Sequence, residues 1–352
     1  MPPRNRTKPS PFAAFLDDVK RQLEPQLKEV LRQSEAEARS LGKEVSVMVH
    51  AVHNLCLRGG KRLRPALCVA GALCYNPRFS WQPALHAGVS LELLQAYFLI
   101  HDDWMDQDTE RRGGPTAHVE LGRALGSSSL GERSAILAGD HAVALASSHL
   151  SNLNVSPGRI KRCMQHFAAM QLAAIAGQQL DIVGKARDPE LTYELKTASY
   201  TVRGPLLMGA ELAGANKPTR VALDQFSRPA GIAFQLRDDL IGVFGDARST
   251  GKPRGSDLKA GKNTSLVKAG LQLTSPRDRD KLLKVLGNSR ATSLQLEAAT
   301  RTLEDCGARA QVELRIDELR DQALLHLARG ALSKEGRELL EGALAALTDR
   351  KT

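Results

Sequence analysis

Acidic side chains are concentrated directly after an apolar run in the segment LQAYFLIHDDWMDQDTERRGGPT, residues 94–116. Asp102 and Asp106 are four residues apart with Asp103 beside them, so on a helix the three carboxylates converge on a small volume. Like charges at this spacing destabilise a helix unless a cation lies among them. Carboxylate oxygens without clustered cysteine or histidine favour Mg²⁺, which usually binds through a few carboxylates and the phosphates of a substrate. The segment therefore predicts a magnesium–diphosphate site.

A second acidic pair follows another apolar run, in FQLRDDLIGVFGD, residues 234–246. It carries Asp238 and Asp239, with Asp246 two turns later. A single D-D-x-x-D pattern is usually a solvated helix face. Because both pairs follow strongly apolar helical runs, we expect them to face one cavity and to hold one diphosphate through several ions.

Basic residues near glycine-rich turns are candidates for phosphate binding. GGKRLRP, residues 59–65, places Lys61, Arg62 and Arg64 at an expected helix start, where backbone N–H groups and the positive helix end attract an anion. The alternative is an ordinary basic turn. We interpret Lys61 and Arg64 as phosphate ligands and expect Arg62 to be able to face solvent.

A second basic segment, STGKPRGSDLKAGKNT at 249–264, has the composition of a mobile loop and carries Lys252 and Lys262. It is not a nucleotide P-loop, because its glycine spacing is one residue too long and Pro253 stands where Ser or Thr is required. Such a loop could close over bound phosphate and exclude water. The alternative for either lysine is surface charge.

Further polar candidates lie on neighbouring predicted helices. They are Lys196, Thr197 and Tyr200 on one helix, Gln178 and Asp181 on the preceding one, and Gln235 just before the second acidic pair. Buried polar groups need partners. For Gln178 and Asp181, core hydrogen bonding explains the pattern as well as substrate contact does. His101 is adjacent to Asp102 and points elsewhere on a helix, so we expect a packing or supporting role.

The composition leaves three kinds of partner open. The 352 residues carry a formal net charge of +10, which suits nucleic acid, an anionic membrane surface or a small polyanionic substrate. The basic residues near glycine-rich turns cluster beside the acidic motifs, which favours the small substrate. A nucleic-acid surface would need aromatic residues along a basic face, and Trp81 and Trp104 form no such stripe.

The cysteines and the termini indicate a cytoplasmic protein. The five cysteines have no C-x-x-C spacing and are expected to be reduced core residues: Cys56, Cys68, Cys74, Cys163 and Cys306. Residues 1–11 are basic and proline-rich and read as a disordered lead-in rather than a signal peptide. The longest uncharged run, 163–180, contains several glutamines, so we expect a buried helix and no membrane span.

Helical periodicity extends from residue 11 nearly to the end, without a useful alternating strand. We predict an all-α fold, a single domain over 12–352 in which long helices surround a central cavity. The expected helices cover 12–41, 43–57, 64–73, 83–106, 132–150, 160–183, 191–213 and 220–244, with several more between 276 and 347. Glycines at 42, 59, 60, 113, 114, 131, 158 and 251 are expected in turns and helix stops.

Six motifs in this order resemble those of trans-isoprenyl diphosphate synthases. They are GGKRLRP, DDWMD followed by RRGGPT, GQQLD, KTASYT, FQLRDD and GKPRGSDLKAGKNT, and they span residues 59–264. The resemblance implies an all-α, usually homodimeric enzyme. It implies Mg²⁺-dependent, head-to-tail condensation of isopentenyl diphosphate with an allylic diphosphate, either dimethylallyl or geranyl diphosphate.

The resemblance also implies roles for individual residues. Asp102, Asp106 and Asp238 look like ligands of Mg²⁺, with three ions per site, and Asp103 and Asp239 support them. The residues that grip the allylic diphosphate would be Arg111, Lys196 and Lys252. The isopentenyl diphosphate site would be formed by Lys61, Arg64, Gln95 and Arg112. The reacting centre would be lined by Thr197, Tyr200 and Gln235, and the substrate contacts completed by Gln178, Asp181, Phe234 and Lys262.

One position departs from the pattern of this family. Gly242 occupies the last acidic position of the second motif, which puts metal ligation there in doubt but leaves Asp238 unaffected. Asp246 could supply part of the missing charge.

Product length is predicted from two aromatic residues. Tyr97 and Phe98 lie five and four residues before Asp102, roughly 6–7.5 Å along a helix axis. In the family that the chain resembles, aromatic residues at these positions accompany short products. We therefore expect farnesyl diphosphate, with geranylgeranyl diphosphate as the alternative.

Other classes of protein share some of these features. A terpene cyclase or head-to-head synthase has acidic helices but needs no second diphosphate pocket of the kind that Lys61, Arg64 and Arg112 suggest. A non-catalytic regulatory subunit would be expected to lose acidic positions. The intact first motif argues against it, whereas Gly242 keeps it open.

The metal assignment predicts the effect of one substitution. Asp102→Ala should nearly abolish turnover while leaving the fold intact, because the lost carboxylate binds metal rather than packing in the core. Measurement of kcat together with the circular dichroism spectrum checks this, and an almost unchanged kcat would refute the assignment.

Overall fold

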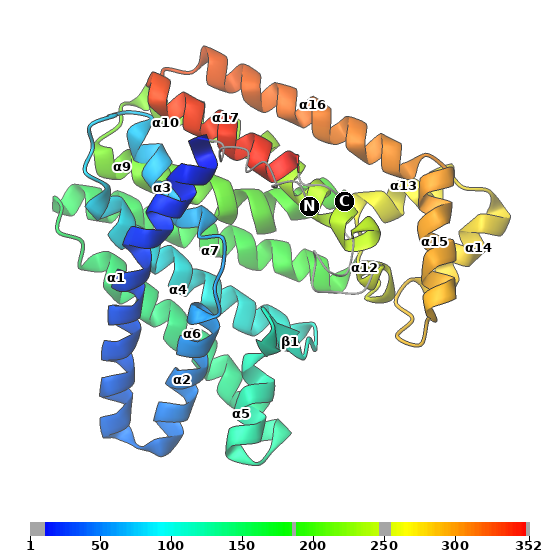
Figure 1. Ribbon diagram of the computed structural model, residues 1–352, viewed down its shortest axis with the longest axis horizontal. Helices are drawn as coiled ribbons and strands as arrows, with labels where there is room; N and C mark the ends of the chain where they lie inside the picture. Colours follow the sequence, from blue (N-terminus) through cyan, green and yellow to red (C-terminus); the bar gives the residue numbers. More distant parts are fainter. Residues whose placement is uncertain (1–10, 185–187, 246–254, 350–352) are drawn as a thin grey trace, which may run out of the picture. The chain divides into compact units, whose positions relative to one another are not determined.

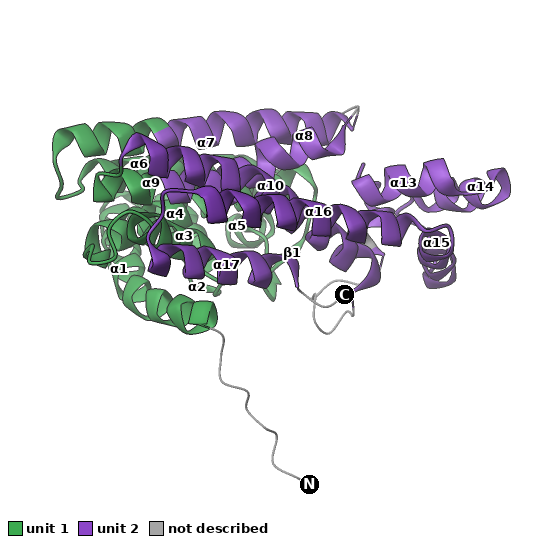
Figure 2. Cartoon of the chain, turned by 90° about the horizontal axis from the view of Figure 1, so that it is seen from above, with its two compact units in different colours: residues 1–165, 208–215 green, residues 166–207, 216–352 purple. Residues whose placement is uncertain are grey.

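The computed structural model describes residues 11–184, 188–245 and 255–349, and nearly all of them are helical. The only strands within these ranges are β1 (Glu110–Arg111) and β2 (Gly114–Pro115), which form one short antiparallel pair. The all-α prediction is confirmed. The chain forms two compact units, Met1–Gln165 with Met208–Ala215, and His166–Leu207 with Asn216–Thr352 (Figure 2). The expectation of a single domain stays a prediction.

Unit 1 contains the helices that precede the middle of the chain. They are α1 (Pro11–Leu41), α2 (Lys43–Leu57), α3 (Leu63–Leu73), α4 (Trp81–Met105), α5 (Ala117–Leu125), α6 (Ser128–Ser151) and parts of α7 (Pro157–Val183) and α9 (Gly204–Ala213). Helices α1 and α2 form an antiparallel hairpin (Figure 1). Helix α1 buries Val19, Leu23, Leu27 and Leu31, which recur every fourth residue along one side of the helix.

Helix α4 carries the first acidic motif and is the most apolar long helix of unit 1. Among the described helices, α4 alone has the length and hydropathy of a membrane span, but 67% of its apolar window is buried inside the protein. Every residue from Ala84 to Leu94 except the half-buried His86 is buried, as expected for a helix in the middle of a core.

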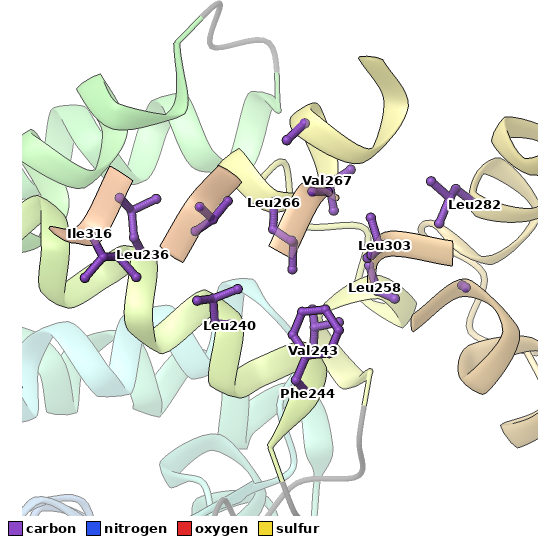
Figure 3. Close-up of a cluster of buried hydrophobic side chains, with 14 of the residues drawn as sticks. Leu236, Leu240, Val243, Phe244, Leu258, Leu266, Val267, Leu282, Leu303 and Ile316 are labelled. Atoms are coloured by element: carbon purple, nitrogen blue, oxygen red, sulfur yellow. The ribbon is translucent and has the colours of Figure 1, made fainter. Parts of the chain in front are cut away.

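Unit 2 contains the later helices. They are α8 (Pro189–Tyr193), the π-helix η1 (Glu194–Arg203), α10 (Lys217–Phe244), α12 (Ser256–Lys259), α13 (Ser265–Leu273), α14 (Pro276–Val285), α15 (Ser293–Asp305), α16 (Ala308–Arg329), α17 (Lys334–Thr348) and the remaining parts of α7 and α9. Their shared core includes Leu240 and Val243 of α10, Leu266 of α13, Leu303 of α15 and Ile316 of α16 (Figure 3). This cluster fixes the helix that carries the second acidic motif.

Several helix predictions need correction. The single helix expected over 191–213 is α8, η1 and α9 in succession, and the short helices α5, α12 and α13 were not expected. Helix α12 lies within the segment 249–264, for which we predicted a loop. The uncharged run 163–180 is only half-buried. Helix α7 buries Phe167 and Met170 on one side, whereas Leu172 is 71% exposed and Ile175 is 50% exposed on the other.

Two of the glycines expected in turns lie inside helices instead. Gly131 lies in α6, where it touches the backbone of α5 at His118 and Gly122, and Gly158 lies in the first turn of α7. Gly42, Gly59, Gly60 and Gly113 do adopt positive φ in turns, and Gly251 lies outside the described residues. Sequence alone does not separate a turn glycine from one that lets two helices approach closely.

Substitution of the two helical glycines should have opposite effects. Gly131→Ala should lower the free energy of unfolding by about 1–3 kcal/mol, because the new methyl group meets the α5 backbone. Gly158→Ala is the matched control and should be neutral or stabilising by up to about 1 kcal/mol, since only the Arg162 side chain is nearby. Urea denaturation compares the two, and equal effects would contradict the close helix contact.

Candidate active site

The first acidic motif lies at the carboxyl end of α4. Asp102 is half-buried, Asp103 is buried, and Asp106 is exposed and ends the helix, its N–H donating to the Asp102 carbonyl at 2.8 Å. The carboxyl end of a helix carries partial negative charge, which disfavours acidic side chains there. Three carboxylates at this end therefore create a local excess of negative charge that a cation would relieve.

Asp103 is held by Arg111, which the β1–β2 hairpin folds back onto the end of α4. Arg111 Nε donates to Asp103 Oδ1 at 2.8 Å, and its Nη2 donates to the same oxygen. Burial raises the pKa of Asp103, and the hydrogen bond and charge of Arg111 oppose that rise. Asp103 Oδ2 is also buried and has no hydrogen-bond partner among the described residues. Asp103 is thus fixed in place, whereas Asp102 remains partly accessible.

The hairpin also brings Arg112 to the GGKRLRP segment. The second diphosphate pocket that the family resemblance implies for these residues stays a prediction. Arg112 adopts φ 52° in the hairpin turn, and its Nη1 donates to the Gly59 carbonyl at 2.7 Å. Lys61, two residues after Gly59, is exposed, and Arg64 is half-buried in the first turn of α3. These three cations belong to one part of unit 1.

Arg62 does not face solvent, contrary to our expectation. Its side chain is buried, with Nη1 donating to Glu92 Oε2 at 2.5 Å and Nη2 donating to the Cys56 carbonyl at 2.9 Å. Arg62 adopts φ 52° immediately before α3, and α4 supplies a buried carboxylate for it. Since its partner lies far away in the sequence, the GGKRLRP motif alone did not reveal this ion pair.

The aromatic residues before the first motif are neighbours on α4, and the Tyr97 and Phe98 ring centroids lie 4.9 Å apart. The Tyr97 ring lies 4.8 Å from the His101 ring, one turn further along, and Phe98 is one turn before Asp102. His101 Nε2 contacts the Ile136 carbonyl of α6 at 3.0 Å, which agrees with the packing role expected for it. Gln95 is half-buried on the same helix.

In unit 2, a close helix contact brings together two of the predicted polar residues. A methyl group on Gly177 of α7 would lie 2.6 Å from the Lys196 backbone nitrogen of η1, so only glycine permits this approach. Asp181 lies one turn after Gly177 on α7, and its Oδ2 accepts a hydrogen bond from Lys196 Nζ at 2.7 Å. Gln178 next to Gly177 has both amide atoms buried without a hydrogen-bond partner among the described residues.

A chain of hydrogen bonds connects η1 to the second acidic motif on α10. Thr197 Oγ1 donates to Gln235 Oε1 at 2.7 Å, and Gln235 Nε2 donates to Asp239 Oδ1 at 2.9 Å. Tyr193 Oη donates to Asp239 Oδ2 at 2.5 Å and accepts from the Ser265 backbone N–H at 2.8 Å. The network therefore fixes Asp239 from both sides and links it to the start of α13.

The two carboxylates of the second pair differ in environment. Burial raises the pKa of Asp239 to about 7, against the opposing effect of its hydrogen bonds, whereas Asp238 is exposed. Tyr193 was not among the predicted residues, because a lone tyrosine at the end of a helix gives no sequence signal of its partner. Tyr200 is buried on η1 and Phe234 is half-buried on α10. Lys262 is exposed, and Lys252 lies outside the described residues.

Comparison with known proteins identifies the family to which the chain belongs. A polyprenyl synthetase profile matches residues 45–303. The chain belongs to the polyprenyl synthetase family. It is a trans-prenyltransferase of the short-chain isoprenyl diphosphate synthase type.

The relatives and solved structures are similar over most of their length. A geranylgeranyl diphosphate synthase of Methanosarcina mazei is 33% identical over 277 residues, 77% of this chain and 78% of the relative. A farnesyl diphosphate synthase of Escherichia coli is 35% identical over 238 residues, 64% of this chain and 75% of the relative. The structure of a Corynebacterium glutamicum geranylgeranyl pyrophosphate synthase, complexed with isoprenyl diphosphate and magnesium, has a TM-score of 0.89 at 33% identity and covers 96% of this chain and 99% of that one.

The donors of both acidic motifs fit the magnesium on which polyprenyl synthetases depend. Each motif offers carboxylate oxygens, which are the protein ligands that Mg²⁺ prefers. The buried Asp103 Oδ2, without a partner among the described residues, is a further polar atom at the first motif. The five cysteines are unpaired thiols, as predicted, but Cys306 is half-buried, whereas the other four lie in the core. Burial raises the pKa of Cys56 to about 12.

The Asp239 network predicts a loss of stability on removal of one hydroxyl group. Tyr193→Phe should lower the free energy of unfolding by about 1–3 kcal/mol, because Asp239 Oδ2 loses a donor and the Ser265 N–H loses an acceptor inside the protein. Tyr75→Phe removes a hydroxyl from a residue that is 39% exposed and serves as the control. Thermal or urea denaturation of both variants measures the difference, and equal stabilities would show that the network contributes little.

Proposed function

We propose that Asp102, Asp106 and Asp238 bind the magnesium ions of the allylic diphosphate, three ions per site. One observation carries this proposal. In each acidic pair the second carboxylate is buried and held by protein partners, Asp103 by Arg111 and Asp239 by Tyr193 and Gln235. The first carboxylate of each pair, Asp102 or Asp238, is more accessible. Each motif thus combines a buried, hydrogen-bonded carboxylate with a more exposed one.

The basic residues divide between two diphosphates in this proposal. Arg111, Lys196 and Lys252 hold the allylic diphosphate as its C–O bond breaks, and Phe234 and Lys262 contribute further contacts. The isopentenyl diphosphate binds to Lys61, Arg64, Gln95 and Arg112. The hydrogen bond from Arg112 to Gly59 supports this second set, because it brings that guanidinium to the GGKRLRP segment.

The chemistry requires no nucleophilic side chain. Magnesium supplies charge neutralisation to the leaving diphosphate when it is bound. The protein orients the isopentenyl double bond towards the allylic carbon, which can lower the barrier by roughly 7–11 kcal/mol. Thr197, Tyr200 and Gln235 line this reacting centre, with Gln178 and Asp181 beside them. The released diphosphate takes the proton that is lost when the new double bond forms.

We propose farnesyl diphosphate as the product, with Phe98 as the main determinant of its length. Phe98 shares a helix face with Asp102 and lies one turn before it, so we assign its ring to the far end of the pocket that holds the growing chain. Tyr97 shares its face with His101 and contacts that ring, so we assign it the smaller effect on length. Geranylgeranyl diphosphate is the second candidate, because a relative and a solved structure that cover most of this chain carry that name.

The same enzyme class is commonly dimeric, and we propose a homodimer. Helix α6 supports this, since its Leu130, Ile136 and Leu137 are 45%, 37% and 58% exposed in the single chain.

Product analysis tests the activity and the length determinant together. The chain with isopentenyl diphosphate, dimethylallyl diphosphate and MgCl₂ should give prenyl diphosphates, identified as alcohols by mass spectrometry after dephosphorylation. Tyr97→Ala with Phe98→Ala should lengthen the products, because removal of both rings deepens the pocket. Phe98→Ala alone should have the larger part of this effect, and Tyr75→Ala should have none.

Two outcomes would contradict the proposal. Absence of any condensation product would favour a cyclase or a regulatory subunit. An unaltered product distribution in the double variant would remove Phe98 and Tyr97 as determinants of length.

A further inference from the structure

The third position of the second acidic motif is Gly242, and the carboxylate of another residue, Asp257, lies against it. A Cβ atom on Gly242 would lie 2.7 Å from Asp257 Cγ and closer still to Oδ2. No side chain fits at position 242 while Asp257 keeps this place. Gly242 is one turn after Asp238 on α10 and shares its helix face. A carboxylate is therefore present where the motif lacks one, but it comes from α12.

The position of Asp257 is fixed by its neighbour in the sequence. Leu258 is 1% exposed and packs in the cluster that contains Val243 and Phe244 of α10 (Figure 3). The Leu258 N–H donates to the Gly255 carbonyl at 3.0 Å, and the Lys262 N–H donates to the Asp257 carbonyl at 3.2 Å. These contacts hold the α12 turn against α10, so the proximity of Asp257 to Gly242 follows from packing.

The charges around Asp257 suit a cation and a phosphate. Residues four apart on a helix have Cβ atoms about 5–6 Å apart, so the carboxylate above Gly242 lies within roughly one turn of Asp238. Two carboxylates at such a separation repel each other unless a cation lies between them. Lys262 Nζ lies 3.4 Å from Asp257 Oδ1, and its side chain is 44% exposed. Asp257 therefore faces a lysine on one side and Gly242 of α10 on the other. Burial raises the pKa of Asp239, the neighbour of Asp238, and the charge of Asp257 raises it further.

We propose that Asp257 replaces the missing third carboxylate of the second acidic motif and, with Asp238, holds magnesium at this end of the diphosphate. This inference rests on the proposed function and assigns it a further residue. It explains how the chain tolerates glycine at the last position of the motif. Asp246, which we considered as the source of the compensating charge, lies outside the described residues.

The test measures binding of inorganic pyrophosphate to the full-length chain by titration calorimetry at several MgCl₂ concentrations. Asp257→Asn keeps the size of the side chain and removes its charge. It should weaken magnesium-dependent pyrophosphate binding by about 10- to 100-fold, the effect typical of residues that support a metal site. Asp280→Asn, at an exposed aspartate of α14, is the matched control and should bind as the wild type does.

Relocation of the carboxylate distinguishes a metal-site role from a packing role. Gly242→Asp combined with Asp257→Ala returns the acid to the motif and should recover most of the affinity that Asp257→Ala loses. Gly242→Asp alone should lower the melting temperature, because its side chain meets Asp257.

Two results would overturn the inference. They are wild-type affinity in Asp257→Asn and failure of the relocated acid to improve on Asp257→Ala. The second result would mean that Asp257 only orients Lys262 or packs against α10. If the wild-type chain itself shows no magnesium-dependent pyrophosphate binding, the proposed function fails, and this inference fails with it.

Discussion

Two buried carboxylates, Asp103 and Asp239, impose the electrostatic constraint on which both acidic motifs depend. An ionised carboxyl group that leaves water loses solvation worth several kcal/mol unless hydrogen bonds and opposite charge replace it. Asp103 is compensated by the Arg111 guanidinium, and Asp239 by the Tyr193 hydroxyl and the Gln235 amide. The two solutions differ in charge, because one uses an ion pair and the other uses neutral donors. The pKa of Asp239 is accordingly raised to about 7 by burial.

The same arrangement leaves the neighbouring carboxylates, Asp102 and Asp238, more exposed to solvent. Adjacent residues on a helix point in different directions, so anchoring of the second aspartate in each pair leaves the first on the accessible side. The anchor also limits movement of the helix end. A metal site works best when its ligands are held by a second layer of hydrogen bonds. The β1–β2 hairpin supplies that layer in unit 1. In unit 2 it comes from Tyr193 of α8 and from Gln235 of α10, which η1 holds through Thr197.

Close contact between helices determines where the polar groups of unit 2 lie. Helix η1 is approached by α7 at Gly177 and by α10 at Gly231, where a Cβ atom would overlap Lys196 or Ala198. Because glycine at both contacts has no Cβ atom, the backbones of α7 and α10 can pack directly against η1. Lys196 then reaches Asp181, and Thr197 reaches Gln235. A π-helix at this place is consistent with its frequent occurrence at functional sites. Gly177 and Gly231 each lower the stability of their helix, but they allow the close packing that positions the polar side chains of η1.

The sequence by itself determined the features that depend on local spacing. Helical periodicity located most of the long helices, and the spacing of Asp102, Asp106 and Asp238 after apolar runs indicated magnesium and diphosphate chemistry. Periodicity and charge spacing act within a few turns of one helix, so they can be read without knowledge of distant partners.

The tertiary structure decided everything that depends on residues far apart in the chain. The Arg62–Glu92 ion pair, the Tyr193–Asp239 hydrogen bond and the carboxylate of Asp257 against Gly242 each join different helices. The distances between such groups are set by how helices pack, and a motif records neither the partner nor the distance. For the same reason Gly131 resembled a turn residue in the sequence, although its role is to let α5 and α6 touch.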